Sequence, residues 1–253
     1  MTASIARICR YPVKGLSAEQ LEHVRLAPGE GLPHDRRFAI AHGATRFDPQ
    51  APEWQPKTNY FMLMRDERLA QLRVAFDEER GTITISRAGK QVVSAKATEP
   101  LGRTLIDQFF AGFLGSAARG APKLLEAPGY MFSDVPEKVV SLINLASVSD
   151  LERVARAPVD PLRFRANLYL EGLPAWAEMD WTGKEIGAGA ARLRVMKPIT
   201  RCAAINVDPE TARRDMNLPL SLQRGFGHVR MGIYAEVLQG GEIATGDPVT
   251  PPA

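Results

Sequence analysis

The sequence holds only two cysteines, Cys9 and Cys202, among its 253 residues. Two thiols cannot form a disulfide framework or a four-thiolate metal site. No uninterrupted apolar run approaches the roughly 18 residues of a membrane-spanning helix, so we expect no such helix. The N-terminal residues lack the apolar core and the small-residue cleavage site of a secretory signal. We therefore expect a cytoplasmic protein whose thiols stay reduced.

The excess of positive charge is small, with 32 Lys and Arg against 29 Asp and Glu. The cationic residues are scattered, and aromatic residues make up only 7% of the chain, which leaves no stacking platform for bases. We expect no nucleic-acid partner, whereas a small anionic ligand fits this charge balance well. With 45% hydrophobic and 24% charged residues, the composition is that of a folded globular protein.

The common catalytic signatures are missing. The sequence contains no G-x-S-x-G, H-E-x-x-H or C-x-x-C motif. Gly89-Lys90 and Gly183-Lys184 lack the Ser or Thr that follows the lysine of a P-loop, and segment 187–192 lacks the third glycine of a dinucleotide fingerprint. The four histidines lie far apart in sequence, which argues against a zinc site.

Most of the sequence is typical of short strands. Residues 82–86, Thr-Ile-Thr-Ile-Ser, alternate polar and apolar side chains as a half-buried strand does. Further strands are predicted at 5–11, 21–26, 37–41, 72–76, 138–143, 167–170, 193–196, 203–207 and 233–238. Gly240-Gly241, between 233–238 and 242–244, predicts a two-residue hairpin turn, because glycine tolerates positive φ. The pattern predicts a mainly β protein with added helices (α+β), built from barrel or sandwich modules.

Two helices stand out against this pattern. In 100–114 apolar residues recur at intervals of three and four, and Gly115 follows at the place of a C-terminal cap. A second helix is predicted at about 148–156, with Ser147 and Asp150 as a capping box.

The Gly, Ala and Pro residues of 115–122 predict a domain boundary. One domain then covers 1–120 and includes the helix at 100–114, and a second covers 121–253. The proline-containing segment 43–59 is predicted to be a long irregular loop, and such loops often carry function.

The two cysteines stand in different settings. Cys9 lies in an alternating strand and is predicted to be a small buried residue. Cys202 follows Arg201 at the start of a predicted strand, after Pro198 has ended another. A thiol beside a guanidinium favours the thiolate, which binds soft metals or attacks electrophiles. From the residues alone, a structural and a reactive role for Cys202 both stay open.

Cationic and polar residues gather in three short segments. Lys14 lies between Pro12 and Gly15, where a phosphate can approach the backbone, and Arg36 stands in the segment His34-Asp35-Arg36-Arg37. Arg163 and Arg165 share one face if their segment is extended, and paired guanidinium groups suit phosphate. The alternative for each segment is a solvated strand face with surface ion pairs.

Taken together, these segments resemble the MOSC family, named for the C-terminal domain of molybdenum cofactor sulfurase. The first part resembles the β-barrel domain that precedes many MOSC domains, and the second part resembles the MOSC domain itself. The resemblance covers nearly the whole chain and rests on an ordered series of motifs: Ile5-Ala6-Arg7-Ile8, Tyr11-Pro12-Val13-Lys14-Gly15, Gly31-Leu32, Asp35-Arg36-Arg37-Phe38, Ser141-Leu142-Ile143-Asn144, Arg163-Phe164-Arg165-Ala166-Asn167, Trp176-Ala177-Glu178-Met179-Asp180-Trp181, Ile186-Gly187, Arg201-Cys202, Val207-Asp208-Pro209-Glu210-Thr211 and Gly246-Asp247-Pro248-Val249.

The resemblance implies an N-terminal β-barrel-like domain packed on a MOSC β-barrel domain. It also implies a molybdenum cofactor, a pterin whose dithiolene binds molybdenum and whose phosphate lies in a cationic pocket. Cys202 then matches the cysteine that ligates molybdenum in relatives and is the predicted catalytic residue. The family is further associated with pyridoxal phosphate binding.

The resemblance assigns cofactor contacts to a set of polar side chains: Lys14, Arg36, Lys57, Lys138, Arg163, Arg165, Asn167, Arg201 and Asp208. Lys14 matches a lysine near the pterin phosphate, and Arg165 and Asn167 match an R-P-N motif in which Ala166 replaces proline. Lys57 stands where the family often has the arginine of a T-x-R motif. Lys138 is expected to contact the phosphate, and Asp208 to orient the cysteine loop.

Two functions of different classes follow from the resemblance. The first is a molybdoenzyme that reduces small N-hydroxylated substrates. Because the sequence has no ferredoxin-like cysteine set and no flavin or nicotinamide fingerprint, its electrons would come from a separate donor protein. The second is a non-catalytic carrier, in which Cys202 holds the cofactor for delivery or bears a persulfide. A third hypothesis is a degenerate member of the family that binds no cofactor.

Overall fold

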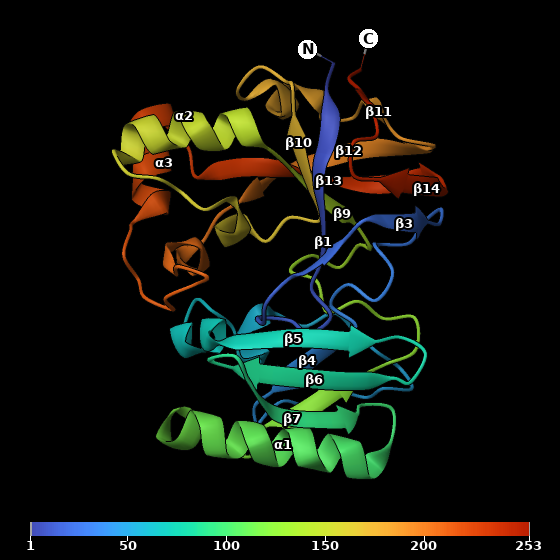
Figure 1. The fold of residues 1–253 in the computed structure, drawn as a ribbon, viewed down its shortest axis with the longest axis vertical. Helices are drawn as coiled ribbons and strands as arrows, with labels where there is room; N and C mark the ends of the chain where they lie inside the picture. The colour runs from blue at the N-terminus through green and yellow to red at the C-terminus, as the bar shows by residue number, and fades with distance from the viewer. Residues whose placement is uncertain (1, 253) are drawn as a thin grey trace.

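The structure is a computed structural model that describes residues 2–252. It is mainly β with a few helices, which confirms the predicted fold class (Figure 1). The strands are β1 (Ser4–Arg10), β2 (Glu19–Leu21), β3 (His23–Leu26), β4 (Phe38–Ala41), β5 (Leu72–Asp77), β6 (Thr82–Arg87), β7 (Lys90–Lys96), β8 (Lys123–Glu126), β9 (Val140–Asn144), β10 (Leu168–Glu171), β11 (Glu185–Ala188), β12 (Ala191–Thr200), β13 (Arg230–Gln239), β14 (Gly241–Ala244) and β15 (Val249–Thr250). The α-helices are α1 (Pro100–Leu114), α2 (Leu145–Ala155) and α3 (Leu218–Phe226). No helix within residues 2–252 has the length and apolar character needed to cross a bilayer.

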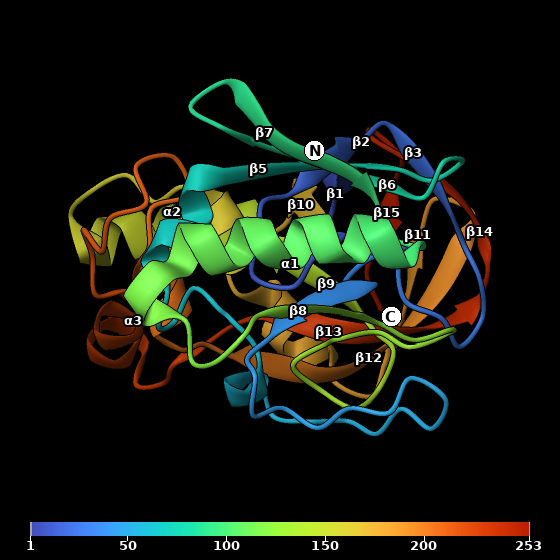
Figure 2. The ribbon, with the colours of Figure 1, turned by 90° about the horizontal axis from the view of Figure 1, so that it is seen from below.

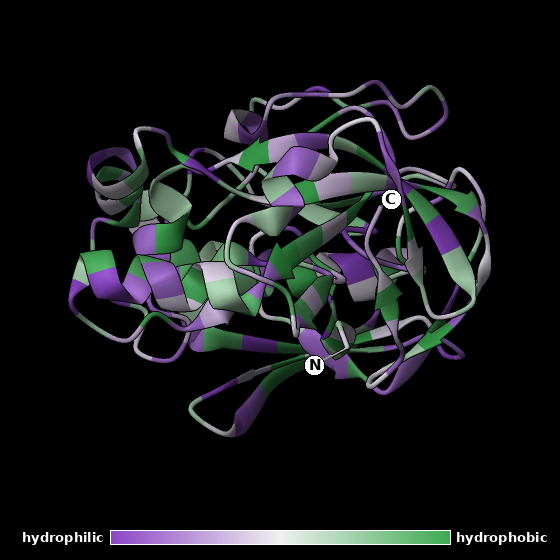
Figure 3. Ribbon diagram, turned by 90° about the horizontal axis from the view of Figure 1, so that it is seen from above, coloured by the Kyte–Doolittle hydropathy of each residue, from purple (hydrophilic) through white to green (hydrophobic). Residues whose placement is uncertain are grey.

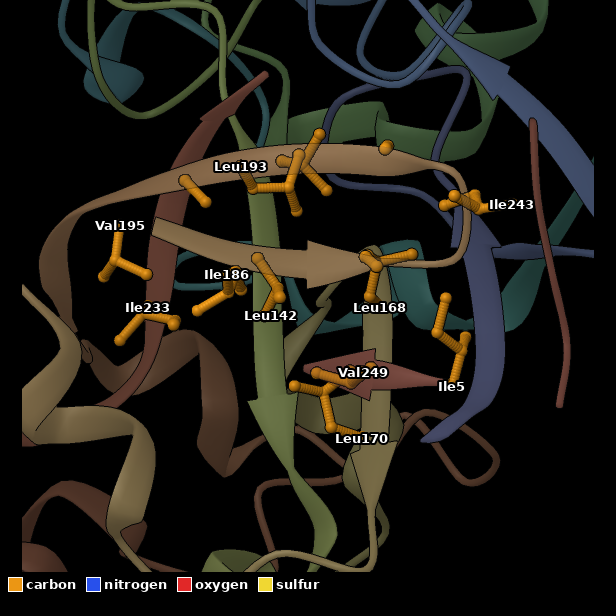
Figure 4. Close-up of a cluster of buried hydrophobic side chains, with 14 of the residues drawn as sticks. Ile5, Leu142, Leu168, Leu170, Ile186, Leu193, Val195, Ile233, Ile243 and Val249 are labelled. Carbon is orange, nitrogen blue, oxygen red and sulfur yellow. The ribbon is translucent and has the colours of Figure 1, made fainter. Parts of the chain in front are cut away.

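The largest element is an eight-stranded sheet in the order β15-β11-β12-β13-β9-β10-β1-β2. Its neighbouring strands are antiparallel except for β9 and β10. The sheet curls around a core of aliphatic side chains, among them Ile5, Leu142, Leu168 and Ile233, which Figure 4 shows converging on one side of the strands. These four side chains are fully buried. Burial of this apolar surface is the main force that joins the first strand of the chain to strands more than 130 residues later.

A smaller layer forms the opposite end of the molecule. The sheet β5-β6-β7 packs against α1, which Figure 2 shows running along it. The alternation in β6 places Ile83 and Ile85 inward, as expected from the sequence. Gly102 allows the close contact of α1 with β7, because a Cβ there would lie 2.0 Å from the Lys96 carbonyl oxygen.

Hydrophobic residues concentrate on the strands of the central sheet, whereas the outer loops are mostly hydrophilic (Figure 3). Two further strand pairs connect segments distant in sequence: β4 with β8 and β3 with β14. β1 and β2 belong to the same sheet as β9–β13, so strand pairing crosses the predicted boundary at 115–122. The division into domains at that point stays a prediction.

The predicted hairpin at Gly240-Gly241 is wrong. β14 follows β13 directly, yet it pairs with β3 and not with β13. Neither glycine has a positive φ. Instead, the chain crosses other backbone closely: a Cβ on Gly240 would lie 2.5 Å from the Leu26 oxygen, and a Cβ on Gly241 would lie 2.6 Å from the Ala190 oxygen. Close approach rather than turn geometry requires glycine here.

The segment around Cys202 also differs from expectation. The predicted strand at 203–207 is a 3₁₀ turn over Ala203–Asn206, and Cys202 precedes it as its N-terminal cap residue. Pro198 does not end a strand but lies inside β12, opposite Ile233 of β13, where the strand register shifts. β11 pairs with only the first half of β12, so the edge beside Pro198 needs no amide donor.

Helix α1 has the predicted bounds, but α2 begins earlier than predicted. Its N-terminal cap is Asn144, whose side chain accepts a hydrogen bond from the Ala146 amide at 3.0 Å. The predicted cap residue Ser147 is buried inside the helix and donates to the Glu178 carboxylate at 2.8 Å. α3 is absent from the predicted elements.

Neighbouring positions on α1 provide a test of this packing. Ile106 is fully buried, whereas Leu105 is 45% exposed. We expect Ile106→Ala to lower the free energy of unfolding by about 2–5 kcal/mol, since it leaves a cavity in the core. Leu105→Ala is the matched control and should change it by only about 0.5 kcal/mol. Urea unfolding measures both, and equal losses would contradict the packing described here.

Candidate functional site

A cavity of about 350 Å³ opens where β12 ends, between loops from distant parts of the chain. This volume lies within the range of small-molecule sites, about 300–1,000 Å³. Eight of the predicted site residues line it: Lys14, Arg36, Lys57, Arg163, Arg165, Asn167, Arg201 and Cys202. The fold thus brings together side chains that the sequence spreads over almost 190 positions.

The wall of this cavity carries an excess of positive charge. The cationic side chains among the lining residues are Lys14, Arg36, Lys57, Arg163, Arg165, Lys197 and Arg201. Asp134 is the one carboxylate among the lining residues of the described chain. Partly enclosed like charges repel strongly in a low dielectric, so this arrangement favours an anionic ligand.

Carboxylates outside the cavity neutralise some of these cations. Arg36 pairs with Asp35, and Lys197 with Glu137 at 3.5 Å. Arg163 Nη2 lies 2.9 Å from Asp208 and 2.7 Å from Asp215. In contrast, neither Arg165 nor Arg201 has a carboxylate within 4.0 Å in residues 2–252.

Cys202 places a half-buried thiol at this cavity. Lys57 Nζ lies 3.4 Å from Cys202 Sγ and 3.6 Å from Asp134 Oδ2. Burial disfavours the Lys57 ammonium group, but Asp134 and Cys202 outweigh that effect and raise the Lys57 pKa. The Lys57 ammonium group therefore lies beside both the Asp134 carboxylate and the Cys202 sulfur. Cys9 is buried as predicted, and burial raises its pKa to about 11.

Lys14 lies deeper in the wall and is only 7% exposed. Its ammonium group donates to the Phe132 carbonyl at 2.9 Å and to Asp134 Oδ1 at 2.5 Å. Burial lowers the Lys14 pKa, and the Asp134 carboxylate counteracts this effect. The two lysines in turn outweigh the burial of Asp134 and hold its pKa well below the usual range.

Arg201 leaves one hydrogen-bond donor unused. Its Nε donates to the Met231 carbonyl at 2.7 Å, and its Nη1 donates to the Phe164 carbonyl at 2.8 Å. Its Nη2 is buried and has no partner in the described residues. Burial lowers the Arg201 pKa. A buried donor of this kind is costly unless a ligand or water accepts its hydrogen bond.

Arg36 and Arg165 form a connected pair. Arg36 Nη2 donates to the Arg165 carbonyl at 2.9 Å, and both guanidinium groups lie over the Tyr11 ring, at 4.7 and 4.4 Å from its centre. The prediction that Arg163 and Arg165 share one face of an extended segment is wrong. The segment Pro161–Phe164 is a 3₁₀ turn, and Arg165 ends it with a φ of 54°.

Comparison with known proteins identifies the family of this chain. A family model described as the MOSC domain matches residues 129–250, and a model described as the MOSC N-terminal beta barrel domain matches residues 2–117. The chain belongs to the MOSC family.

Two curated relatives are similar to parts of this chain. Human molybdenum cofactor sulfurase is 27% identical over 252 residues, which cover 85% of this chain and 28% of the relative. Mouse mitochondrial amidoxime-reducing component 1 is 30% identical over 120 residues, which cover 43% of this chain and 35% of the relative. The chain therefore spans less than a third of the sulfurase and about a third of the mouse protein.

Among solved structures, the YUAD protein from Bacillus subtilis is similar, with 13% identity and a TM-score of 0.46. The match covers 98% of this chain and 94% of that one.

Both MOSC regions contribute to the cavity. Lys14, Arg36 and Lys57 come from the N-terminal match, and Asp134, Arg163, Arg165, Arg201 and Cys202 come from the MOSC domain match. A ligand in the cavity would therefore contact both regions at once.

Three of the predicted residues have other roles. Asn167 lines the cavity, but its amide ties strands together: Nδ2 donates to the Cys9 carbonyl at 3.1 Å, and Oδ1 accepts from the Ser141 amide at 3.0 Å. Lys138 does not reach the cavity and pairs with Glu30 at 2.7 Å. Asp208 is also not among the lining residues, and it forms an ion pair with the Arg163 guanidinium group at 2.9 Å.

The sequence did not single out every side chain that lines the cavity. The lining residues that were not among the predicted site residues include Asp134, Tyr234, Lys197, Met62, Met64 and Met131. Strand alternation in β13 predicts that Tyr234 faces opposite to its neighbours, but it does not say which face holds a cavity. No local signal predicts that the loop around Asp134 folds over Lys14.

The ion pairs of Asp134 predict a pH dependence. Because its pKa is lower in the folded protein, the stabilisation is present above the unfolded pKa of about 3.9 and is lost as the pH falls below it. We expect Asp134→Asn to lower the free energy of unfolding by about 1 kcal/mol at pH 7, since the carboxylate is partly solvated. The difference from the parent should shrink below about pH 4.

Urea unfolding between pH 7 and pH 3 measures this difference. Glu242→Gln is the control, because Glu242 forms an exposed ion pair with Arg25. A difference for Asp134→Asn that stays constant or grows with acidity would contradict the assigned ion pairs.

Proposed function

We propose that the cavity binds a molybdenum cofactor, with the Cys202 thiolate as the protein ligand to molybdenum. The observation that carries the proposal is a thiol in the wall of a cavity that also holds two guanidinium groups, Arg165 and Arg201, with no carboxylate partner in residues 2–252. A thiolate suits a soft metal, and the guanidinium groups suit a phosphate-bearing pterin. Relatives named for molybdenum cofactor and for amidoxime reduction support this assignment.

The residues present fit such a cofactor. The buried Nη2 of Arg201 needs an acceptor, and an anionic oxygen would supply one. Within residues 2–252 no group of three or more His, Cys, Asp or Glu side chains is arranged to hold a metal ion. The metal would therefore depend on the cofactor for its remaining ligands, with Cys202 as the protein's contribution.

The bound cofactor would supply the two-electron redox change of molybdenum. The chain supplies ligation, orientation and charge. Lys14, Arg165 and Arg201 would bind anionic oxygens, while Arg36 holds the Arg165 carbonyl in place. Asp208 and Asp215 fix Arg163, and the Lys57 ammonium group lies beside the Cys202 sulfur. Asn167 keeps the strands beneath the cavity in register.

The proposed reaction is the reduction of an N-hydroxylated substrate. Two electrons and two protons convert an N–OH group to N–H and water. The sequence contains no ferredoxin-like cysteine set and no dinucleotide fingerprint, so a separate donor protein would supply the electrons. A compartment that keeps thiols reduced, such as the cytoplasm, suits the free Cys9 and Cys202.

Molybdenum and pterin content tests this proposal. We expect nearly stoichiometric molybdenum in protein purified from a host that makes the cofactor, and a loss of roughly tenfold or more in Cys202→Ser, because the serine hydroxyl is a poor soft-metal ligand. Cys9→Ala is the matched control and should retain the metal, since Cys9 is buried away from the cavity. Absence of both molybdenum and pterin from every preparation would refute cofactor binding, and an absorbance spectrum of pyridoxal phosphate would assign the cations to that phosphate instead.

A carrier role is the second candidate. The similarity to molybdenum cofactor sulfurase covers most of this chain, and the Lys57 ammonium group beside Sγ would also stabilise a persulfide anion. Mass spectrometry of Cys202 distinguishes the two functions. Persulfide without molybdenum favours the carrier, whereas bound molybdenum with turnover of an N-hydroxylated compound by a chemical reductant favours the enzyme.

A further inference from the structure

Asp134 occupies a distinctive position in the cavity. It is the one carboxylate among the lining residues of the described chain, and its two oxygens contact two different cations. Oδ1 lies 2.5 Å from Lys14 Nζ, and Oδ2 lies 3.6 Å from Lys57 Nζ. A carboxylate that bridges two ammonium groups has the same charge and oxygen donors that an entering anion would offer.

The burial of these groups is uneven. The Lys14 side chain is 8% exposed, whereas the Asp134 side chain is 46% exposed. Lys14 is therefore held in the wall and needs an anion beside it, while Asp134 approaches from the solvent side.

Asp134 belongs to an irregular segment between β8 and β9. Within residues 2–252, the backbone of 134–138 makes no backbone–backbone hydrogen bond with other segments. The carboxylate can leave Lys14 without breaking a strand or a helix.

We propose that Asp134 is an internal counter-ion that occupies the position of the ligand's anionic group and is displaced when that group binds. The identity of the ligand as a phosphate-bearing cofactor rests on the proposed function, but the competition concerns this chain's own residues. An entering anion must replace the ion pairs of Asp134 with Lys14 and Lys57. The displaced Asp134 carboxylate stays near the cavity and repels the bound anion. Asp134 would thus set the affinity of the cavity for anions. A monoanion only replaces the single negative charge of Asp134, whereas a dianion adds a second negative charge beside the two lysines and should bind more tightly.

Binding of inorganic phosphate to the cofactor-free protein tests the competition. Calorimetry at fixed pH and ionic strength compares the parent with Asp134→Asn, which removes the charge but keeps the size of the side chain. We expect phosphate to bind the variant roughly tenfold more tightly, because Lys14 and Lys57 are then unneutralised. Phosphate should also raise the melting temperature of the variant more than that of the parent.

Two comparison variants make the result specific. Glu242→Gln removes the same charge from an exposed ion pair outside the cavity and should leave phosphate affinity within about twofold. Asp134→Glu keeps the charge and should bind phosphate like the parent. Asp134→Ser replaces Asp134→Asn in this comparison if the asparagine variant does not fold.

Equal or weaker phosphate binding by Asp134→Asn would overturn the proposal, because Asp134 would then position the lysines rather than compete for them. An equal gain in Glu242→Gln would also overturn it, since long-range charge would explain the effect. Tighter phosphate binding together with absence of molybdenum would keep the internal counter-ion and refute the cofactor. Bound molybdenum together with an unchanged phosphate affinity of Asp134→Asn would support the cofactor and refute the internal counter-ion.

Discussion

The need to neutralise buried positive charge shapes the centre of this molecule. Seven cationic side chains line one cavity, and burial penalises those that are shielded from water, such as Lys14 and Arg163, unless an acceptor or an anion lies nearby. The acceptors come from many segments: the Phe132, Phe164 and Met231 carbonyls, and the Asp35, Asp134, Asp208 and Asp215 carboxylates. Several of these contacts, such as those of Lys14 with Phe132 and Asp134, hold irregular segments of the chain. Arg165 and Arg201 have no carboxylate partner in residues 2–252, so their positive charge can attract an anion.

The curled sheet makes this concentration of charge possible. Its aliphatic core joins β1 to β10 and β9 to β13, so the segments that follow β1 and β12 meet those that precede β9 and β10 at one place. Asn167 connects this frame to the site, since its amide binds the backbone of β1 and β9. The part of the cavity wall beside Asn167 is therefore fixed by the sheet and its hydrophobic core. The segment around Asp134 does not belong to that sheet.

Local patterns predicted some elements well and others badly. Helix α1 has the predicted bounds because its apolar spacing and Gly115 both act within the helix. The Gly240-Gly241 hairpin failed because those glycines serve a close crossing with Leu26 and Ala190, which lie far away in sequence. Ser147 failed as a cap because its hydroxyl binds the buried Glu178 carboxylate instead. Each error arose where a contact between distant residues replaced a local one.

The sequence by itself determined the mainly β class, the helix α1 and the series of MOSC motifs that singled out Lys14, Arg165, Arg201 and Cys202. These depend on residue type and short spacing, which the sequence states directly. Only the tertiary structure decided that Lys138 faces Glu30, that Asp208 stands behind Arg163, and that Asp134 meets Lys14 across 120 positions. Ion pairs of this range depend on where the strands carry their loops, and burial of the common core, rather than any local preference, determines that arrangement.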